Sequence, residues 1–137
     1  MEQADALTLL ERSRVARLAT VRPDGSPHLV VVTFATLDGT VVTMIDHKPK
    51  TTTHLQRLTN IEAEPRVTLL VDDWSEDWTG LSWARFDGVA EIHREGAVWM
   101  AAREALATRY IQYRNQPPVG PAIVVTIEKI TSWTSTG

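Results

Sequence analysis

Hydrophobic and polar residues alternate along most of the chain with the two-residue period of β-strands. The segments that this pattern predicts as strands are residues 15–21, 28–34, 40–45, 65–72, 82–93 and 122–133. Pro23-Asp24-Gly25-Ser26 separates the first two segments and is typical of a tight turn, which predicts a hairpin there. With the third segment these strands are expected to form an antiparallel meander. The segment 82–93 is expected to be the longest strand, and Gly88 within it indicates a bulge or a close backbone approach.

Three other segments have helical spacing. Residues 5–12 place Leu7 and Leu10 on one face, and residues 95–110 are rich in alanine. Between them, a helix over residues 51–60 would carry Leu55 and Leu58 on a buried face. A basic stripe of Lys50, His54 and Arg57 would lie beside it. Six strands and three helices predict a single α+β domain over residues 1–137, mainly β and closed as a small barrel.

Composition and charge narrow the function. The chain has no cysteine, which excludes disulfides, thiolate-ligated metal sites and a cysteine nucleophile, so any redox chemistry requires a bound organic cofactor. The net charge of −3 gives no general attraction to nucleic acid or to anionic membranes. There is no run of about eighteen apolar residues and no signal-peptide pattern at the acidic N-terminus. We therefore expect a soluble, cytoplasmic protein that binds neither nucleic acid nor membrane.

The most informative segment is residues 43–52, where a predicted strand passes into a predicted helix through Lys48 and Lys50. The free amides and positive dipole end of a helix N-terminus suit a phosphate, and Lys50 would add a point charge. A solvated basic helix start is the alternative, because the segment lacks the specificity of a glycine-rich phosphate loop.

Tryptophans and histidines are weaker signals. Trp74, Trp78 and Trp83 surround the acidic loop 73–80, where they could cover a flat ring, bury a subunit contact or simply pack in the core. Trp99 and Trp133 are assigned to the core. The four histidines, at positions 28, 47, 54 and 93, are too widely spaced for a local metal motif, and we expect no metal.

Residues 15–28, 46–51 and 65–71, read together with this order of elements, resemble the pyridoxamine 5'-phosphate oxidase-like, FMN-binding split-barrel superfamily. Within it, the Asp-His-Lys-Pro-Lys-Thr junction at 46–51 and the tail at 112–118 are most similar to the actinobacterial group of coenzyme F420-dependent enzymes. The resemblance extends from about Leu7 to Trp133.

This resemblance implies a homodimer of six-stranded split barrels, with a flavin or deazaflavin in each of two grooves between subunits. Lys50 and Thr51 would hold its phosphate, with Lys48 and His47 close by. Thr43, Met44 and Ile45 would lie along the ring or ribityl chain. The second strand, including His28, Val30 and Val32, would present backbone groups to the ring. Val31 departs from the family, since relatives often carry proline there.

The leading hypothesis is a coenzyme F420-dependent oxidoreductase that transfers a hydride from the reduced deazaflavin to an unsaturated small molecule. An FMN-dependent oxidase or reductase of the pyridoxamine 5'-phosphate oxidase type, a non-catalytic F420 carrier, and a barrel that binds a protein partner through the tryptophan loop are the alternatives. No general acid is evident from the sequence, and Tyr110, Tyr113 and His28 are the candidates.

Overall fold

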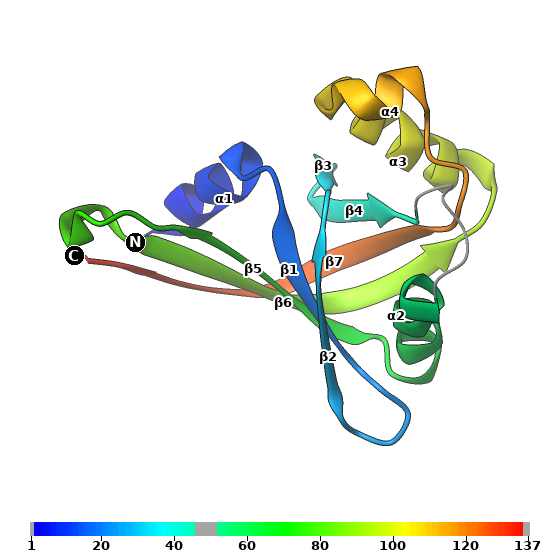
Figure 1. The fold of residues 1–137 in the computed structure, drawn as a ribbon, viewed down its shortest axis with the longest axis horizontal. Coiled ribbons are helices and arrows are strands. Elements are labelled where there is room, and N and C mark those ends of the chain that lie inside the picture. Colours follow the sequence, from blue (N-terminus) through cyan, green and yellow to red (C-terminus); the bar gives the residue numbers. More distant parts are fainter. Residues whose placement is uncertain (1, 46–51, 136–137) are drawn as a thin grey trace.

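The computed structural model describes residues 2–45 and 52–135, which build one curled antiparallel sheet with helices around it (Figure 1). The sheet has seven strands in the order β2-β1-β5-β6-β7-β4-β3. Their bounds are β1 (Ala16–Val21), β2 (Pro27–Val32), β3 (Ala35–Leu37), β4 (Thr40–Met44), β5 (Arg66–Asp73), β6 (Ser82–His93) and β7 (Ala122–Thr134). The edge strands β2 and β3 follow one another in the chain. This confirms the predicted mainly β split-barrel fold with flanking helices.

Three details of the predicted sheet are wrong. There are seven strands rather than six, because the predicted strand 28–34 ends at Val32 and the chain bends into β3. The meander is also wrong, since β1–β2 and β3–β4 are separate hairpins at opposite edges of the sheet. At the bend, the backbone N–H of Phe34 donates to the Tyr110 hydroxyl at 3.2 Å, so a side chain takes the place of a strand partner. Finally, the longest strand is β7, with 13 residues, and not β6, which has 12.

The helices are α1 (Gln3–Arg12), α2 (Thr52–Ala63), α3 (Gly96–Arg109) and α4 (Ile111–Asn115), with a 3-10 turn η1 (Trp78–Gly80). The prediction for α1 is confirmed, although Leu7 is exposed and Leu9 is buried in its place. Helix α2 continues three residues beyond the predicted end. The predicted helix 95–110 stops at Tyr110, whose extended backbone separates α3 from α4.

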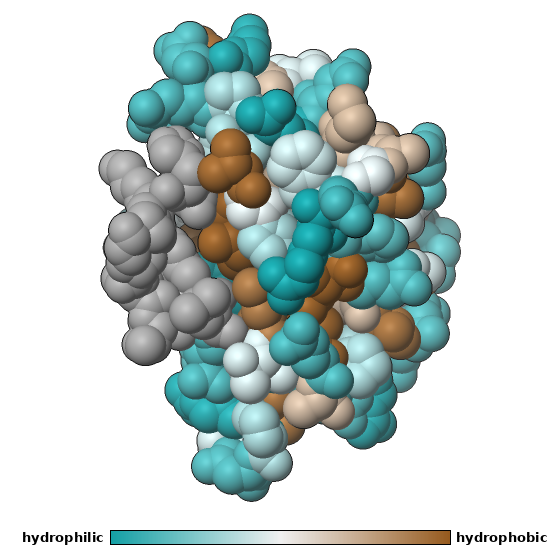
Figure 2. Space-filling view, turned by 90° about the vertical axis from the view of Figure 1, so that its right-hand side faces the viewer, coloured by the Kyte–Doolittle hydropathy of each residue, from teal (hydrophilic) through white to brown (hydrophobic). Residues whose placement is uncertain are grey.

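Two hydrophobic clusters fill the structure. The larger one lies inside the curled sheet and includes Leu18, Leu69 and Phe86, with residues of α1 and α2 packed against them. The smaller one lies between β4, β7 and α3 and includes Met44 and Leu106. No helix in the described ranges is long and apolar enough to span a membrane. Figure 2 shows the side that lies on the right in Figure 1, where exposed hydrophobic residues in the centre are bordered by hydrophilic ones.

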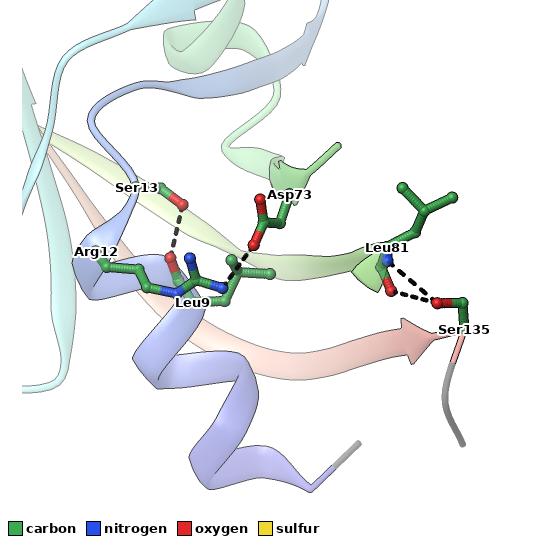
Figure 3. Close-up of polar contacts among 6 residues, drawn as sticks. All are labelled: Leu9, Arg12, Ser13, Asp73, Leu81 and Ser135. Carbon is green, nitrogen blue, oxygen red and sulfur yellow. Dashed lines mark hydrogen bonds and ion pairs between the residues drawn. The ribbon is translucent and has the colours of Figure 1, made fainter. Parts of the chain in front are cut away.

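Polar contacts tie α1 to the far end of the sheet, where the two chain ends lie on the same side (Figures 1 and 3). Arg12 pairs with Asp73 at 2.9 Å, and the Ser13 hydroxyl donates to the Leu9 carbonyl at the end of α1. The Leu81 N–H donates to the Ser135 hydroxyl at 3.1 Å. These contacts are largely exposed, so each contributes little energy, but together they fix how the helix and strand ends meet.

The β6–β7 pairing shifts register between Asp87 and Gly88, which confirms the predicted bulge. A Cβ atom built on Gly88 would lie 2.2 Å from the carbonyl oxygen of Thr126 in β7. Because that neighbour is backbone, it cannot rotate away. The predicted close approach is therefore also present.

We predict that Gly88→Ala destabilises the protein by about 1–3 kcal/mol, the usual cost of overpacking a core. Urea denaturation followed by tryptophan fluorescence measures this loss. Gly80→Ala is the matched control, since a Cβ there meets nothing within 4 Å. Equal stability of the two variants would contradict the close approach at Gly88.

Candidate functional site

The predicted phosphate-binding residues His47, Lys48, Lys50 and Thr51 lie outside the described residues. Their flanks are described: β4 ends at Met44 and α2 begins at Thr52. The predicted passage from strand to helix is thus confirmed at both ends. The roles of the four residues between these ends stay predictions.

The three residues predicted to line the ring from β4 and its end have buried side chains. The Thr43 hydroxyl donates to the Thr33 carbonyl at 2.6 Å, and Met44 belongs to the smaller hydrophobic cluster. Ile45 packs in the larger cluster, and its N–H donates to the carbonyl of Pro121 at 3.0 Å. A ligand beside this strand end would therefore meet mainly backbone atoms.

Strand β2 presents two different faces. His28 and Val32 are buried and Val30 is half-buried, whereas Leu29 and Val31 are 66% and 60% exposed. Among the described strands, β2 pairs only with β1, so one edge of β2 has no strand partner. This edge could receive hydrogen-bonding groups of a flat ring, as the resemblance implies.

Helix α2 carries a buried polar row that includes Arg57, which was predicted to lie on a basic stripe beside the buried face. Arg57 is only 8% exposed and Asn60 is fully buried. Asn60 donates to the Thr20 hydroxyl at 2.9 Å and accepts from Gln56 at 2.7 Å, which fixes α2 on β1. Arg57 shares this face with Ile61 four residues later, a helical spacing that could have indicated its burial.

Charges at this face alter two pKa values. Burial lowers the pKa of His28, and the positive charges of Arg22 and Arg57 lower it further. Burial also lowers the pKa of Arg57, with a smaller opposing effect from Tyr113. His28 is consequently neutral at pH 7, and Arg57 carries a buried charge. The Arg57 Nε and the His28 Nδ1 have no hydrogen-bond partner within the described residues.

Both candidate tyrosines have structural contacts. The Tyr110 hydroxyl, besides accepting from Phe34, donates to the Arg14 carbonyl at 2.7 Å. The Tyr113 hydroxyl shares a 2.8 Å hydrogen bond with the Thr33 hydroxyl. Tyr113 also lies near enough to Arg57 to influence its pKa. Of the two phenols, Tyr113 is therefore the one associated with the buried polar face.

A groove of about 710 Å³ lies on the other face of the sheet, and we call it the outer-face groove. Residues of β1, β2, β5, β6 and β7 line it, together with the loop after β5. Its apolar residues include Leu29, Trp74, Trp83 and Trp133. Arg17 and Asp72 form an ion pair of 2.8 Å within it. Sequence reasoning missed this groove because strand pairing, not sequence proximity, assembles it.

The tryptophans divide between core and surface. Trp99 packs against the smaller cluster and donates to the Gly120 carbonyl at 2.9 Å, as predicted for a core residue. The prediction for Trp133 is wrong: it is 44% exposed, because the end of β7 extends beyond the core. Trp74 and Trp78 are exposed and contact each other with ring centroids 6.0 Å apart. Within the described residues, no group of histidine and acidic side chains could hold a metal ion.

Solved structures of the same fold include proteins with different ligands. The conserved hypothetical protein Rv2991 from Mycobacterium tuberculosis is 25% identical, with a TM-score of 0.80 over 98% of this chain and 86% of that one. A FAD-binding protein from Mesorhizobium loti is 20% identical, with a TM-score of 0.76 over 96% and 94%. HutZ, the heme storage protein from Vibrio cholerae, is 16% identical, with a TM-score of 0.72 over 96% and 93%.

A comparison with curated proteins found no match. The model of one protein family, described as pyridoxamine 5'-phosphate oxidase, matches residues 3–134, nearly the whole chain. The matched span contains every strand of the curled sheet and the buried face of α2. This chain therefore belongs to the pyridoxamine 5'-phosphate oxidase family.

Proposed function

We propose that the protein is an oxidoreductase that uses coenzyme F420, and that it reduces an unsaturated, conjugated small molecule. The observation that carries this proposal is the position of the basic segment. It lies between the end of β4 and the start of α2, and it holds two of the three lysines of the chain, Lys48 and Lys50. A helix start with adjacent cations suits the phosphate of such a cofactor.

The choice of F420 over a flavin rests on the resemblance of the junction at 46–51 and of the tail at 112–118. FMN is the second candidate, and the FAD-binding protein of the same fold favours a flavin in general. A non-catalytic carrier is the third candidate, because HutZ, a protein of the same fold, is a heme storage protein.

When bound, a reduced deazaflavin would supply the hydride for the reduction. The residues of this chain would bind and orient it: the lysines at its phosphate, and the free edge of β2 along its ring. Reduction of a conjugated double bond also needs a proton. Neutral His28 is a poor acid at pH 7, and the two tyrosine hydroxyls are occupied by protein contacts. We therefore expect the proton to come from water.

We further propose that a second copy of the chain covers the outer-face groove. Leu29 and Val31 are large apolar residues exposed on one face of β2, next to the exposed tryptophans of the groove. Apolar and aromatic surface of this kind is typical of the centre of a subunit interface. A homodimer would also place the cofactor sites between subunits, as the resemblance implies.

The cofactor proposal predicts that F420 quenches tryptophan fluorescence with micromolar or tighter affinity and that FMN binds more weakly. Lys50→Ala should weaken F420 binding by about 1.5–3 kcal/mol, the range of a charge-assisted hydrogen bond. Lys129→Ala is the control, since Lys129 is exposed on β7.

Binding of neither cofactor to the wild-type protein would refute the proposal, and tighter binding of FMN would favour the flavin enzyme instead. Oxidation of reduced F420 by a panel of quinones and enones then distinguishes an enzyme from a carrier.

The dimer proposal predicts that Leu29→Arg converts the protein to a monomer in sedimentation velocity experiments. Burying an unpaired guanidinium at an apolar interface is unfavourable, whereas Leu29 is already solvated in a single chain. Val119→Arg serves as the control, because Val119 is similarly exposed but does not line the groove. A wild-type protein that sediments as a monomer would contradict this proposal.

A further inference from the structure

Arg57 is a buried positive charge without a counter-charge in the described structure. It is 8% exposed, its Nε has no hydrogen-bond partner there, and none of the ion pairs among the described residues includes it. The nearest acidic residues along the chain are engaged elsewhere: Glu62 pairs with Arg94 at 3.5 Å, and Glu64 pairs with Arg66 at 2.7 Å. An ion buried without a partner is strongly unfavourable, so a stable fold needs an anion beside it.

His28 has the second unsatisfied atom. Its Nδ1 is buried without a partner within the described residues, and its side chain is also 8% exposed. His28 is the register partner of Thr20, and Asn60, three residues after Arg57 on α2, donates to the Thr20 hydroxyl at 2.9 Å, so His28 and Arg57 lie in the same region between β2 and α2. They come from different elements, β2 and α2. Buried polar atoms are almost always hydrogen-bonded. Two unsatisfied nitrogens in one buried region, on separate elements, therefore indicate one shared ligand.

The position of Arg57 on α2 indicates where this ligand would lie. Arg57 is five residues after the first helical residue, Thr52. Side chains of an α-helix are inclined toward its N-terminus, so we expect the guanidinium to extend back along α2 toward the end that follows β4. That end is the one at which a phosphate is expected. Tyr113 of α4 borders the same region, since its hydroxyl shares a 2.8 Å hydrogen bond with Thr33, the residue after β2.

We propose that Arg57 and His28 bind a phosphoryl group between β2 and α2. The guanidinium would donate from its Nε–H and a terminal N–H to two phosphoryl oxygens, and the neutral imidazole would donate from Nδ1 to a third. The charge of the ligand would compensate the buried charge of Arg57. This inference deepens the proposed function and rests on it only for the identity of the molecule that carries the phosphoryl group.

Inorganic phosphate alone is the probe, and thermal melting is the measurement. Phosphate should raise the melting temperature of the wild-type protein relative to sodium chloride of equal ionic strength, because a ligand that binds only the folded state stabilises it. Sodium acetate should raise it less, since a carboxylate has no third oxygen for His28. Arg57→Met should weaken the apparent phosphate affinity by about tenfold or more. Arg94→Met, which removes an exposed arginine of comparable size, should not.

The second test compares melting temperatures in sodium chloride without phosphate. If Arg57 has no partner there, the Arg57→Met variant is at least as stable in sodium chloride as the wild type. A structural arginine with a permanent partner would give the opposite result, a loss of stability in chloride that phosphate does not alter. That result would overturn the proposal.

Arg57→Lys provides the third test, which also serves if the methionine variant does not fold. It keeps the charge but loses the Nε–H, so it should retain a weakened response to phosphate.

Phosphate should also raise the pKa of His28 in the wild-type protein, as followed by histidine NMR, because it adds a negative charge beside the ring. An unchanged His28 signal, or a wild-type protein that phosphate does not stabilise, would overturn the proposal. Failure of F420 and FMN to bind, with the phosphate response intact, would instead refute only the cofactor proposal.

Discussion

The arrangement of the whole sheet depends on how closely β6 and β7 approach each other. The two strands pair from Ser82–Thr134 to His93–Ala122, with one register shift beside Gly88. At that point the backbone of β7 occupies the space that a side chain would need. A bulge bends its strand and increases the local twist. Because β6 joins β5 to β7 in the middle of the sheet, this bend turns the two halves toward each other. It thereby allows β2 and β3, at opposite edges, to be joined by only Thr33 and Phe34.

The corner between β2 and β3 is held by side chains from the C-terminal half of the chain. Tyr110 bonds to the backbone of Phe34, and Tyr113 bonds to Thr33. The same region connects the helices: Arg109 donates to the Glu11 carbonyl in the last turn of α1, and Arg14 donates to the Arg109 carbonyl at the end of α3. The two arginines thus satisfy carbonyls at the C-terminal ends of α1 and α3, where no intrahelical donor exists. This network fixes β2 at one end, and among the described strands the outer edge of β2 has no partner.

The sequence predicted the strands well where burial alternates strictly. The segment 82–93 matches β6 residue for residue, and the glycine at 88 indicated its bulge. It predicted pairing poorly, because alternation in residues 28–34 continues through a bend at which the strand partner changes. The outer-face groove was unpredictable for the same reason, since Leu29, Trp83 and Trp133 meet only through the ladder. The burial of Arg57 was not predicted, because arginine is rarely buried in proteins. Its helical spacing from Ile61, four residues later, would have indicated that it lies on the buried face of α2. The passage from β4 to α2, by contrast, was predicted correctly because its order of strand, cations and helix is local.

A buried arginine and lysines before a helix would contribute to ligand binding in different ways. Lysines at a helix start attract any anion and are screened by salt, so they increase affinity with little discrimination. Arg57 is removed from water, and no described carboxylate compensates its charge, so the proposed ligand would have to reach it with negative oxygens. A neutral ligand of the same shape would leave that charge unpaired and would be rejected, which is how an unfavourable group produces specificity. The same group makes the unliganded protein less stable than its packing would allow. Stability and ligand choice would then depend on one residue, and a stabilising substitution at Arg57 would reduce selectivity for the phosphoryl group.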